Sequence, residues 1–234
     1  MGMRILRHIL SLLLVLSLES IADQKTIAIY VQAPIADPEC ALALKNVLMT
    51  QHKVKMLQHD TLIPDNLKEV DCIAFPGGLE DVDNFDTLLI DKKELVQQFV
   101  KRGGGYLGIC MGAYLADESY FDLLQGIRVE QYVNRPRADF KDEEKCTVLP
   151  IKWYRYNYYM YFYDGAAFVG NLNLAKKIAT YSNKDAMAII QEKIGLIGCH
   201  PESQLDWYTG NLKDFWHKEE HHRLLLNFVN LLLN

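Results

Sequence analysis

Short apolar runs alternate with helical segments through the first half of the chain, and this alternation restricts the fold more than any other feature. Residues 26–31 form a β-branched apolar run followed by a loop that contains proline, and the run at 70–75 stops at Pro76-Gly77-Gly78. Strands are predicted at residues 26–31, 53–57, 70–75 and 106–109, and helices at 38–50, 91–101 and 111–124. Strands connected in this way lie parallel and are covered on both faces. We therefore predict an α/β fold with a mostly parallel central sheet.

The pattern changes after Gln125. Residues 147–168 are rich in tyrosine and alternate irregularly, which indicates antiparallel strands or a hairpin with a turn at Asp164-Gly165. Further strands are predicted at 178–181, 186–191 and 195–199, followed by an amphipathic helix from residue 212 to the end. No repeat, low-complexity tract or linker divides these elements, so we expect a single domain.

The first 22 residues have the features of a secretory signal peptide. Arg4 and Arg7 precede an almost wholly apolar run over residues 9–18, and Ser20-Ile21-Ala22 supplies small residues before a cut at Asp23. The alternative is a buried helix or an uncleaved anchor, for which the apolar run is short. We expect an exported protein, periplasmic or secreted, whose domain spans residues 23–234 with no stable membrane anchor after cleavage.

Composition narrows the possible partners. The 234 residues are 50% hydrophobic and 24% charged, which is typical of a globular protein. The formal net charge is −5, and binding to nucleic acid depends on a basic surface that neutralises phosphates. We therefore expect no nucleic-acid partner. The oligomeric state stays open.

A cysteine lies between two glycines where a predicted strand passes into a predicted helix, in Gly108-Ile109-Cys110-Met111-Gly112. This pattern is typical of a sharp turn that exposes a nucleophile above the sheet. The following helix favours a thiolate, the reactive form of cysteine. The alternative is a structural cysteine buried beside two packing glycines.

Two further motifs offer the partners that a thiol nucleophile needs. A predicted strand ends in His200-Pro201-Glu202, where His200 can act as the base and Glu202 can fix its tautomer. Another strand ends in Pro76-Gly77-Gly78. The backbone N–H groups of Gly77 and Gly78, with that of Met111, can stabilise a developing oxyanion.

The order of these motifs resembles the class I glutamine amidotransferase-like superfamily, and within it most closely the N-terminal domain of biotin–protein ligases. The resemblance is carried by GGGYLGICMGAY at residues 103–114 and by Tyr163-Asp164-Gly165 through Phe168. It implies a flavodoxin-like three-layer sandwich, a Cys110–His200–Glu202 triad and an oxyanion hole near Gly77 and Gly78. Gly198-Cys199 stands where those enzymes usually carry Gln-Phe, so the resemblance favours thiol chemistry over glutamine as the substrate.

The sequence therefore predicts an exported, cysteine-dependent amide hydrolase that acts on a small-molecule or peptide amide. It predicts no metal and no organic cofactor. The alternative is a catalytically silent module that binds a ligand or supports an assembly on the same fold. A third possibility, an aldehyde or stress-type hydrolase, would place an acidic residue beside the cysteine, and the sequence offers no clear candidate.

Three other features are interpreted structurally. His217 to His221 matches an inverted zinc-protease pattern, but an exposed face of a terminal helix explains it better. The tyrosines between residues 154 and 163 are typical of a strand pair that covers the core, although half of them can line a cleft. Arg135 and Arg137 are predicted on an exposed loop, where the alternative is a contact with a substrate carboxylate.

The chain has five cysteines, an odd number, and the predicted nucleophile Cys110 accounts for the unpaired one. Cys72 and Cys199 are expected in the core. If export permits a disulfide, Cys40 and Cys146 are the first pair to examine.

Overall fold

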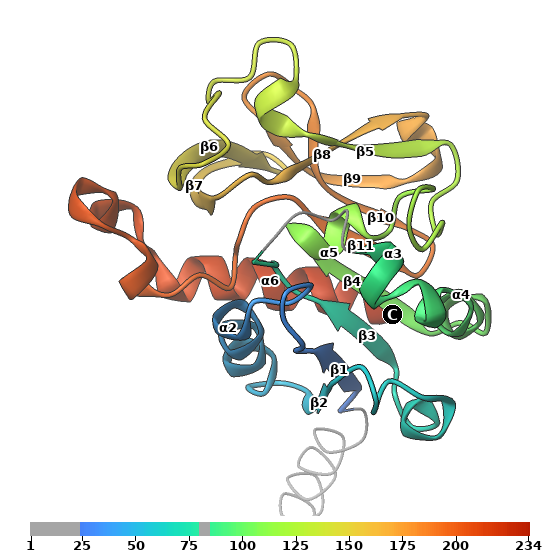
Figure 1. Cartoon of the computed structure of the whole chain (residues 1–234). Helices are drawn as coiled ribbons and strands as arrows, with labels where there is room; N and C mark the ends of the chain where they lie inside the picture. Colours follow the sequence, from blue (N-terminus) through green and yellow to red (C-terminus); the bar gives the residue numbers. More distant parts are fainter. Residues whose placement is uncertain (1–23, 80–84) are drawn as a thin grey trace, which may run out of the picture.

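The computed structural model describes residues 24–79 and 85–234, so the predicted signal peptide lies outside the described residues. One mixed sheet has the strand order β2-β1-β3-β4-β11-β10-β9-β6-β7, with β8 paired to β10 and β5 paired to β8 (Figure 1). The strands are β1 (Thr26–Tyr30), β2 (Lys53–Leu57), β3 (Cys72–Phe75), β4 (Gly105–Ile109), β5 (Ile127–Gln131), β6 (Thr147–Trp153), β7 (Tyr156–Phe162), β8 (Ala166–Gly170), β9 (Lys176–Tyr181), β10 (Ala186–Gln191) and β11 (Ile194–Ile197).

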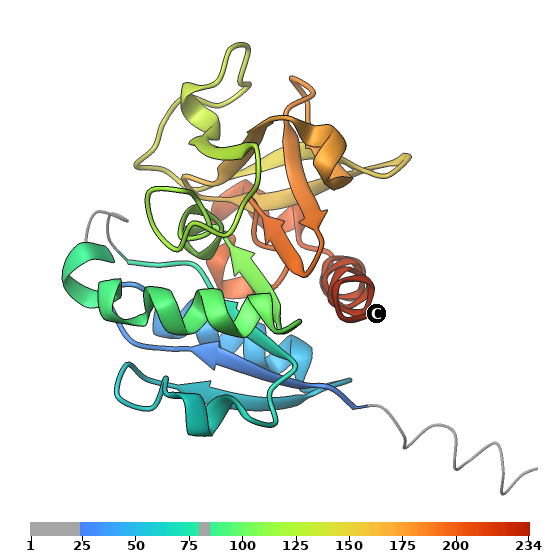
Figure 2. The same ribbon diagram turned by 90° about the vertical axis from the view of Figure 1, so that its right-hand side faces the viewer.

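The sheet has a parallel half and an antiparallel half. Strands β2, β1, β3, β4 and β11 pair in parallel, whereas β10, β9, β6 and β7 continue the sheet in antiparallel pairs. In Figure 2 the antiparallel strands, coloured yellow to orange, lie above the parallel strands at the blue and green end of the scale. Strands β1, β3, β4 and β11 are buried on both faces, which explains their nearly continuous apolar sequences, whereas the edge strand β2 is mostly exposed.

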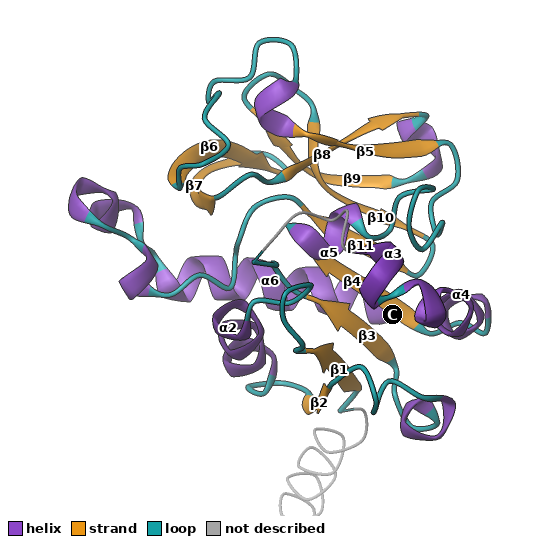
Figure 3. Cartoon of the chain, in the orientation of Figure 1, coloured by secondary structure: helices purple, strands orange, loops and turns teal. Residues whose placement is uncertain are grey.

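Helices cover both faces of the parallel half. Helices α2 (Pro38–Leu48) and α6 (Lys218–Leu233) pack on one face, and α4 (Lys93–Lys101) packs on the other (Figure 3). The shorter helices are α3 (Phe85–Leu88), α5 (Met111–Tyr114), η1 (Pro64–Leu67), η3 (Ile90–Lys92), η4 (Tyr132–Asn134), η5 (Leu172–Leu174), η6 (Leu205–Trp207) and η7 (Gly210–Phe215). The predicted three-layer α/β sandwich of flavodoxin-like type is confirmed.

The predicted helix over 111–124 was wrong in length, because α5 is a single turn from Met111 to Tyr114. Asp117 explains its early end. One carboxylate oxygen accepts a hydrogen bond from the backbone N–H of Ser119, and the other accepts one from that of Val129 on β5. A side chain that binds backbone groups outside the helix draws the chain into a loop.

Two boundaries in the second half also differ from the prediction. The turn of the β6–β7 hairpin is at Tyr154-Arg155, and Tyr154 adopts a φ of 50° there. Asp164-Gly165 instead lies in the link between β7 and β8. The terminal helix begins at Lys218, because η7 occupies the residues that the amphipathic pattern assigned to its start.

The loop after η4 is held by ion pairs. Arg135 binds the carboxylates of Glu130 and Asp185, and its Nε lies 2.8 Å from an Asp185 oxygen. Lys141 Nζ donates to the backbone carbonyls of Val133 and Arg135. Both sides of the Arg135 guanidinium group are therefore engaged within the fold, which favours a structural role over a contact with a substrate carboxylate. Among residues 24–79 and 85–234, no helix has the length and apolar character needed to cross a membrane.

Candidate active site

Cys110 lies on a strained turn directly after β4. Its φ of 51° and ψ of −109° are unusual for a residue with a side chain. A Cβ atom on Gly112 would lie 1.9 Å from the carbonyl oxygen of Phe75, and one on Gly108 would lie 2.3 Å from the carbonyl oxygen of Gly112. The two glycines let the turn close against β3, and the arrangement matches the predicted nucleophile elbow.

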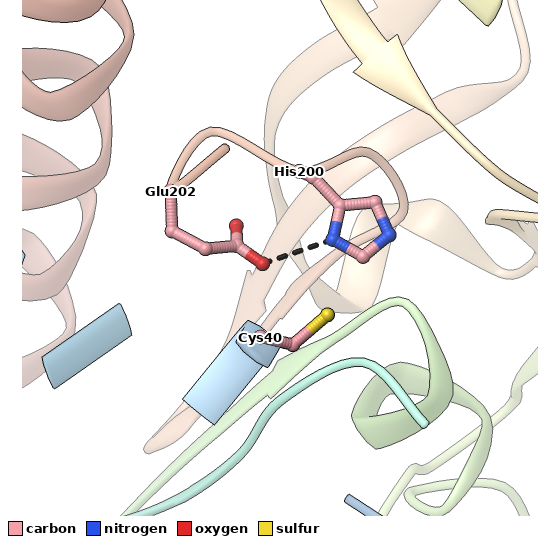
Figure 4. A group of neighbouring side chains, drawn as sticks. All are labelled: Cys40, His200 and Glu202. Atoms are coloured by element: carbon pink, nitrogen blue, oxygen red, sulfur yellow. Dashed lines mark hydrogen bonds and ion pairs between the residues drawn. The ribbon is translucent and has the colours of Figure 1, made fainter. Parts of the chain in front are cut away.

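His200 and Glu202 follow β11, the strand that neighbours β4. Figure 4 shows the Glu202 carboxylate directed at the His200 ring, and its Oε1 lies 2.9 Å from Nδ1. Both side chains are buried, with Glu202 fully enclosed. Because Nδ1 is engaged by Glu202, Nε2 is the ring nitrogen left for another partner. Cys110 and Glu202 both act on the pKa of His200, so both lie near its ring.

The turn of Gly77 and Gly78 lies against both parts of the triad. A Cβ on Gly77 would be 2.9 Å from His200 Cε1, and one on Gly78 would be 2.8 Å from Met111 Cγ. Within the described residues, the backbone N–H groups of Gly77, Gly78 and Met111 donate no hydrogen bond. They are therefore available as donors beside Cys110, as an oxyanion hole requires.

The charged group that can stabilise a thiolate at Cys110 is His200 rather than the helix that follows. Helix α5 has only four residues, so the dipole that the sequence prediction relied on is small. Burial by itself lowers the pKa of His200, but the Cys110 sulfur and the Glu202 carboxylate outweigh it and raise this pKa from 6.5 to about 10. An imidazolium beside the sulfur stabilises a thiolate. The Cys110 thiol also lies 3.4 Å from the backbone carbonyl oxygen of Tyr163.

A second cysteine, Cys40, lies at this site, although no sequence motif marks it. Cys40, His200 and Glu202 each place a ligand atom within 4.8 Å of the others (Figure 4). Cys40 lies in the first turn of α2, which Asp37 caps by accepting from the N–H of Glu39. The N–H of Asp37 donates to the carbonyl of Gly77, so the start of α2 is tied to the glycine turn.

Two aromatic side chains pack against the buried ring of His200. Tyr161 on β7 and Trp207 in η6 pack edge-on against the ring at centroid distances of 5.9 and 5.7 Å. The neighbouring Met160 and Phe162 point into the core. The expectation that the tyrosines of this segment cover the core was wrong for Tyr154, Tyr156, Tyr159 and Tyr163, which are exposed, whereas Tyr161 contacts the candidate site.

The remaining cysteines and histidines behave as structural residues. All five cysteines are free thiols, so Cys40 and Cys146 are not bridged. Cys72 and Cys199 are fully buried in the core, as expected. The expected exposed face at His217 to His221 was wrong for His221, which is fully buried on α6. Burial lowers the pKa of His221 to about 4.

Comparison with known proteins supports the predicted resemblance. Residues 33–136 match the family described as "Biotin-protein ligase, N terminal". The resemblance is confirmed. The matched segment covers less than half of the chain and includes Cys40, Gly77, Gly78 and Cys110, but ends before His200. A search of the curated proteins found no match.

Solved structures show the same fold at low identity. A glutamine amidotransferase from Thermotoga maritima has a TM-score of 0.63 at 13% identity, covering 91% of this chain and 99% of that one. PurLQS from the same organism has a TM-score of 0.59 at 13% identity, covering 90% and 100%. A glutamine amido transferase from Methylobacillus flagellatus has a TM-score of 0.53 at 15% identity, covering 78% and 72%. The chain therefore has the glutamine amidotransferase-like fold.

Proposed function

We propose that this protein is an exported, cysteine-dependent hydrolase of amides, with Cys110 as the nucleophile, His200 as the proton carrier and Glu202 as the residue that orients His200. The observation that carries the proposal is that Cys110 lies on a strained turn and interacts electrostatically with His200, which is buried and paired with Glu202. Fold similarity at this identity supports only the architecture, so the chemistry is argued from these side chains.

The reaction follows from the positions of the groups. The Cys110 thiolate attacks the amide carbonyl carbon, and the carbonyl oxygen becomes an oxyanion that accepts from the N–H groups of Gly78 and Met111. Imidazolium His200 then donates its Nε2 proton to the leaving nitrogen, so the C–N bond breaks and a thioester remains. Water, deprotonated by the now neutral His200, cleaves the thioester and releases a carboxylic acid.

The alternative, a catalytically silent binding module on the same fold, predicts a Cys110 that is sealed from solvent or distant from His200. The Cys110 side chain is largely buried, with 8% of the residue exposed, and a sealed cysteine would favour a binding role. The electrostatic interaction between Cys110 and His200 favours catalysis instead, because distant residues could not exchange a proton. The proposal of export depends on the predicted signal peptide alone and is tested by sequencing the N-terminus of the protein from the native cell.

Two measurements test the hydrolase. Iodoacetamide should label Cys110 at neutral pH faster than the half-buried Cys146, and His200→Ala should remove that difference. Ammonia or amine release from a panel of small and peptide amides should be abolished in Cys110→Ala and retained in Cys146→Ala. Equal labelling of the two cysteines, together with release that survives Cys110→Ala, would overturn the proposal.

A further inference from the structure

Cys40 adds a thiol to the side of the site that the proposed hydrolysis does not use. Its sulfur, a ring nitrogen of His200 and a carboxylate oxygen of Glu202 lie within 4.8 Å of one another, and all three residues are buried. Figure 4 shows the Cys40 sulfur directed toward the His200 ring, which Glu202 approaches from beside it. Thiolate, imidazole and carboxylate are the three ligand types that zinc uses in proteins.

The charges around Cys40 favour a cation. The Cys40 sulfur lies 3.7 Å from Oδ2 of Asp37, and a carboxylate oxygen of Glu202 lies within 4.8 Å of it. No lysine or arginine within residues 24–79 and 85–234 forms an ion pair with either carboxylate. Buried negative charge without a fixed cation is costly unless it is paired or binds a metal. His200 is the single cationic partner that Glu202 has there.

Glu202 also has an unused ligand atom. Its Oε1 is engaged by His200, whereas its Oε2 is buried and has no hydrogen-bond partner among the described residues. Buried polar atoms are nearly always satisfied, so an unpaired carboxylate oxygen at this position calls for an explanation. A carboxylate that turns to bind a metal through either oxygen would resolve the imbalance.

We propose that Cys40, His200 and Glu202 form a zinc site whose occupation switches the hydrolase off. Zinc would take the Cys40 sulfur, Nδ1 of His200 and one Glu202 oxygen, with water as the fourth ligand. Tetrahedral ligands at about 2.0–2.3 Å from zinc lie roughly 3.3–3.8 Å apart, so the Nδ1–Oε1 separation must open slightly. Binding releases two protons, one from the Cys40 thiol and one from Nδ1.

Zinc at this site would block the proton transfer by His200, because the metal and the transferred proton use the two nitrogens of the same ring. When zinc occupies Nδ1, the ring keeps its proton on Nε2 and can no longer accept a proton from Cys110 or from water. Glu202 is lost as the orienting partner in the same step. Inhibition therefore rests on the proposed function, whereas the binding of zinc does not.

Zinc binding is measured first, without reference to activity. Metal-free protein is titrated with Zn²⁺ in competition with a chromogenic chelator, and Co²⁺ is added in parallel to look for a thiolate-to-metal absorption band. We expect one tight equivalent per chain and a cobalt band that depends on Cys40. Cys40→Ser should weaken zinc binding by about 100-fold or more, and Glu202→Gln should weaken it by about 10-fold or more.

Matched thiol variants separate this site from chance binding. Cys146→Ser and Cys110→Ser should both keep the tight equivalent, because neither sulfur is a ligand in the proposed site. Circular dichroism and thermal unfolding confirm that each variant is folded. Tight binding that survives Cys40→Ser, or a wild-type chain without a tight equivalent, would overturn the inference.

Activity forms a separate arm of the experiment. On an amide that the wild type cleaves, one equivalent of Zn²⁺ should inhibit cleavage and a chelator should restore it. The activity left in Cys40→Ser should resist that zinc concentration. If no amide is cleaved while zinc still binds through Cys40, the proposed function fails and the metal site stands. If cleavage is found without tight zinc binding, the reverse holds.

Discussion

Replacing Glu202 by glutamine tests the electrostatics of the site without changing its shape. Glutamine keeps an oxygen that can accept from His200 Nδ1 but removes the negative charge that lies 2.9 Å from the ring. Glu202 is fully buried, so water does not screen this charge. A hydrogen bond to a charged group contributes about 1.5–3 kcal/mol, roughly twice the contribution of a neutral one.

The loss is expressed in the pKa of His200, which now lies at about 10. Because glutamine keeps a neutral hydrogen bond worth about half of the charged one, the protonated form loses about 0.75–1.5 kcal/mol. This lowers the pKa by about 0.5–1, since 1.36 kcal/mol corresponds to one pH unit. The lowered pKa still lies above neutral pH, so His200 keeps its positive charge near pH 7 and loses it at a lower pH than in the wild type.

The assay is an NMR titration of protein labelled with ¹³C at histidine Cε1, in which the His200 signal is assigned by its absence in His200→Asn. The rate of Cys110 alkylation by iodoacetamide is followed over the same pH range. Glu219→Gln serves as the matched control, because Glu219 is exposed on α6 and should leave the His200 titration unchanged. A His200 pKa that stays within about 0.3 of the wild-type value, or that rises, would refute the coupling described here.

Three further predictions concern stability. Gly112→Ala should destabilise the fold by about 3 kcal/mol or more, seen in denaturant unfolding, because its methyl group would lie 1.9 Å from the Phe75 carbonyl oxygen. Arg135→Ala should lower the free energy of unfolding by about 1–3 kcal/mol, since its ion-paired carboxylates lose their partner, whereas Arg137→Ala on the same loop should change it by less than about 0.5 kcal/mol. Because its folded pKa is raised, His200 should add stability that is complete below pH 6.5 and lost as the pH rises to about 10, and His200→Ala should flatten that part of a stability–pH curve.

The sequence predicted those parts of the fold that depend on local pattern. Strands β1, β3, β4 and β11 are buried on both faces, so their apolar runs and the turns that end them were informative. The length of α5 was not predictable in this way. Its end depends on hydrogen bonds that the Asp117 carboxylate accepts from the backbone N–H groups of Ser119 and Val129. Val129 lies twelve residues further along the chain, so a local sequence pattern does not reveal it as a partner.

The candidate site was predictable where a motif fixes both the residue type and the backbone. Cys110 needs close-packed glycines on each side, and His200 and Glu202 are separated by one proline at a strand end, so the sequence displays each arrangement directly. The proximity of the two motifs follows from the neighbouring strands β4 and β11. This proximity could be inferred only through the family resemblance, because the distance between two motifs along the sequence does not determine which strands are neighbours in the sheet.

Cys40 lacks such a motif, yet the sequence held a usable signal for it. Asp37-Pro38 marks a helix start, and a helix that follows the first strand of a parallel sheet begins at the edge where the carboxyl ends of the strands meet. Residues in the first turn of that helix therefore face the same edge as Cys110 and His200. Cys40 occupies that turn, and its neighbour Asp37 fastens it to Gly77 of the glycine turn. Cys40 is therefore better interpreted as a second thiol beside the imidazole of His200, where the proposed zinc would bind, than as half of a disulfide.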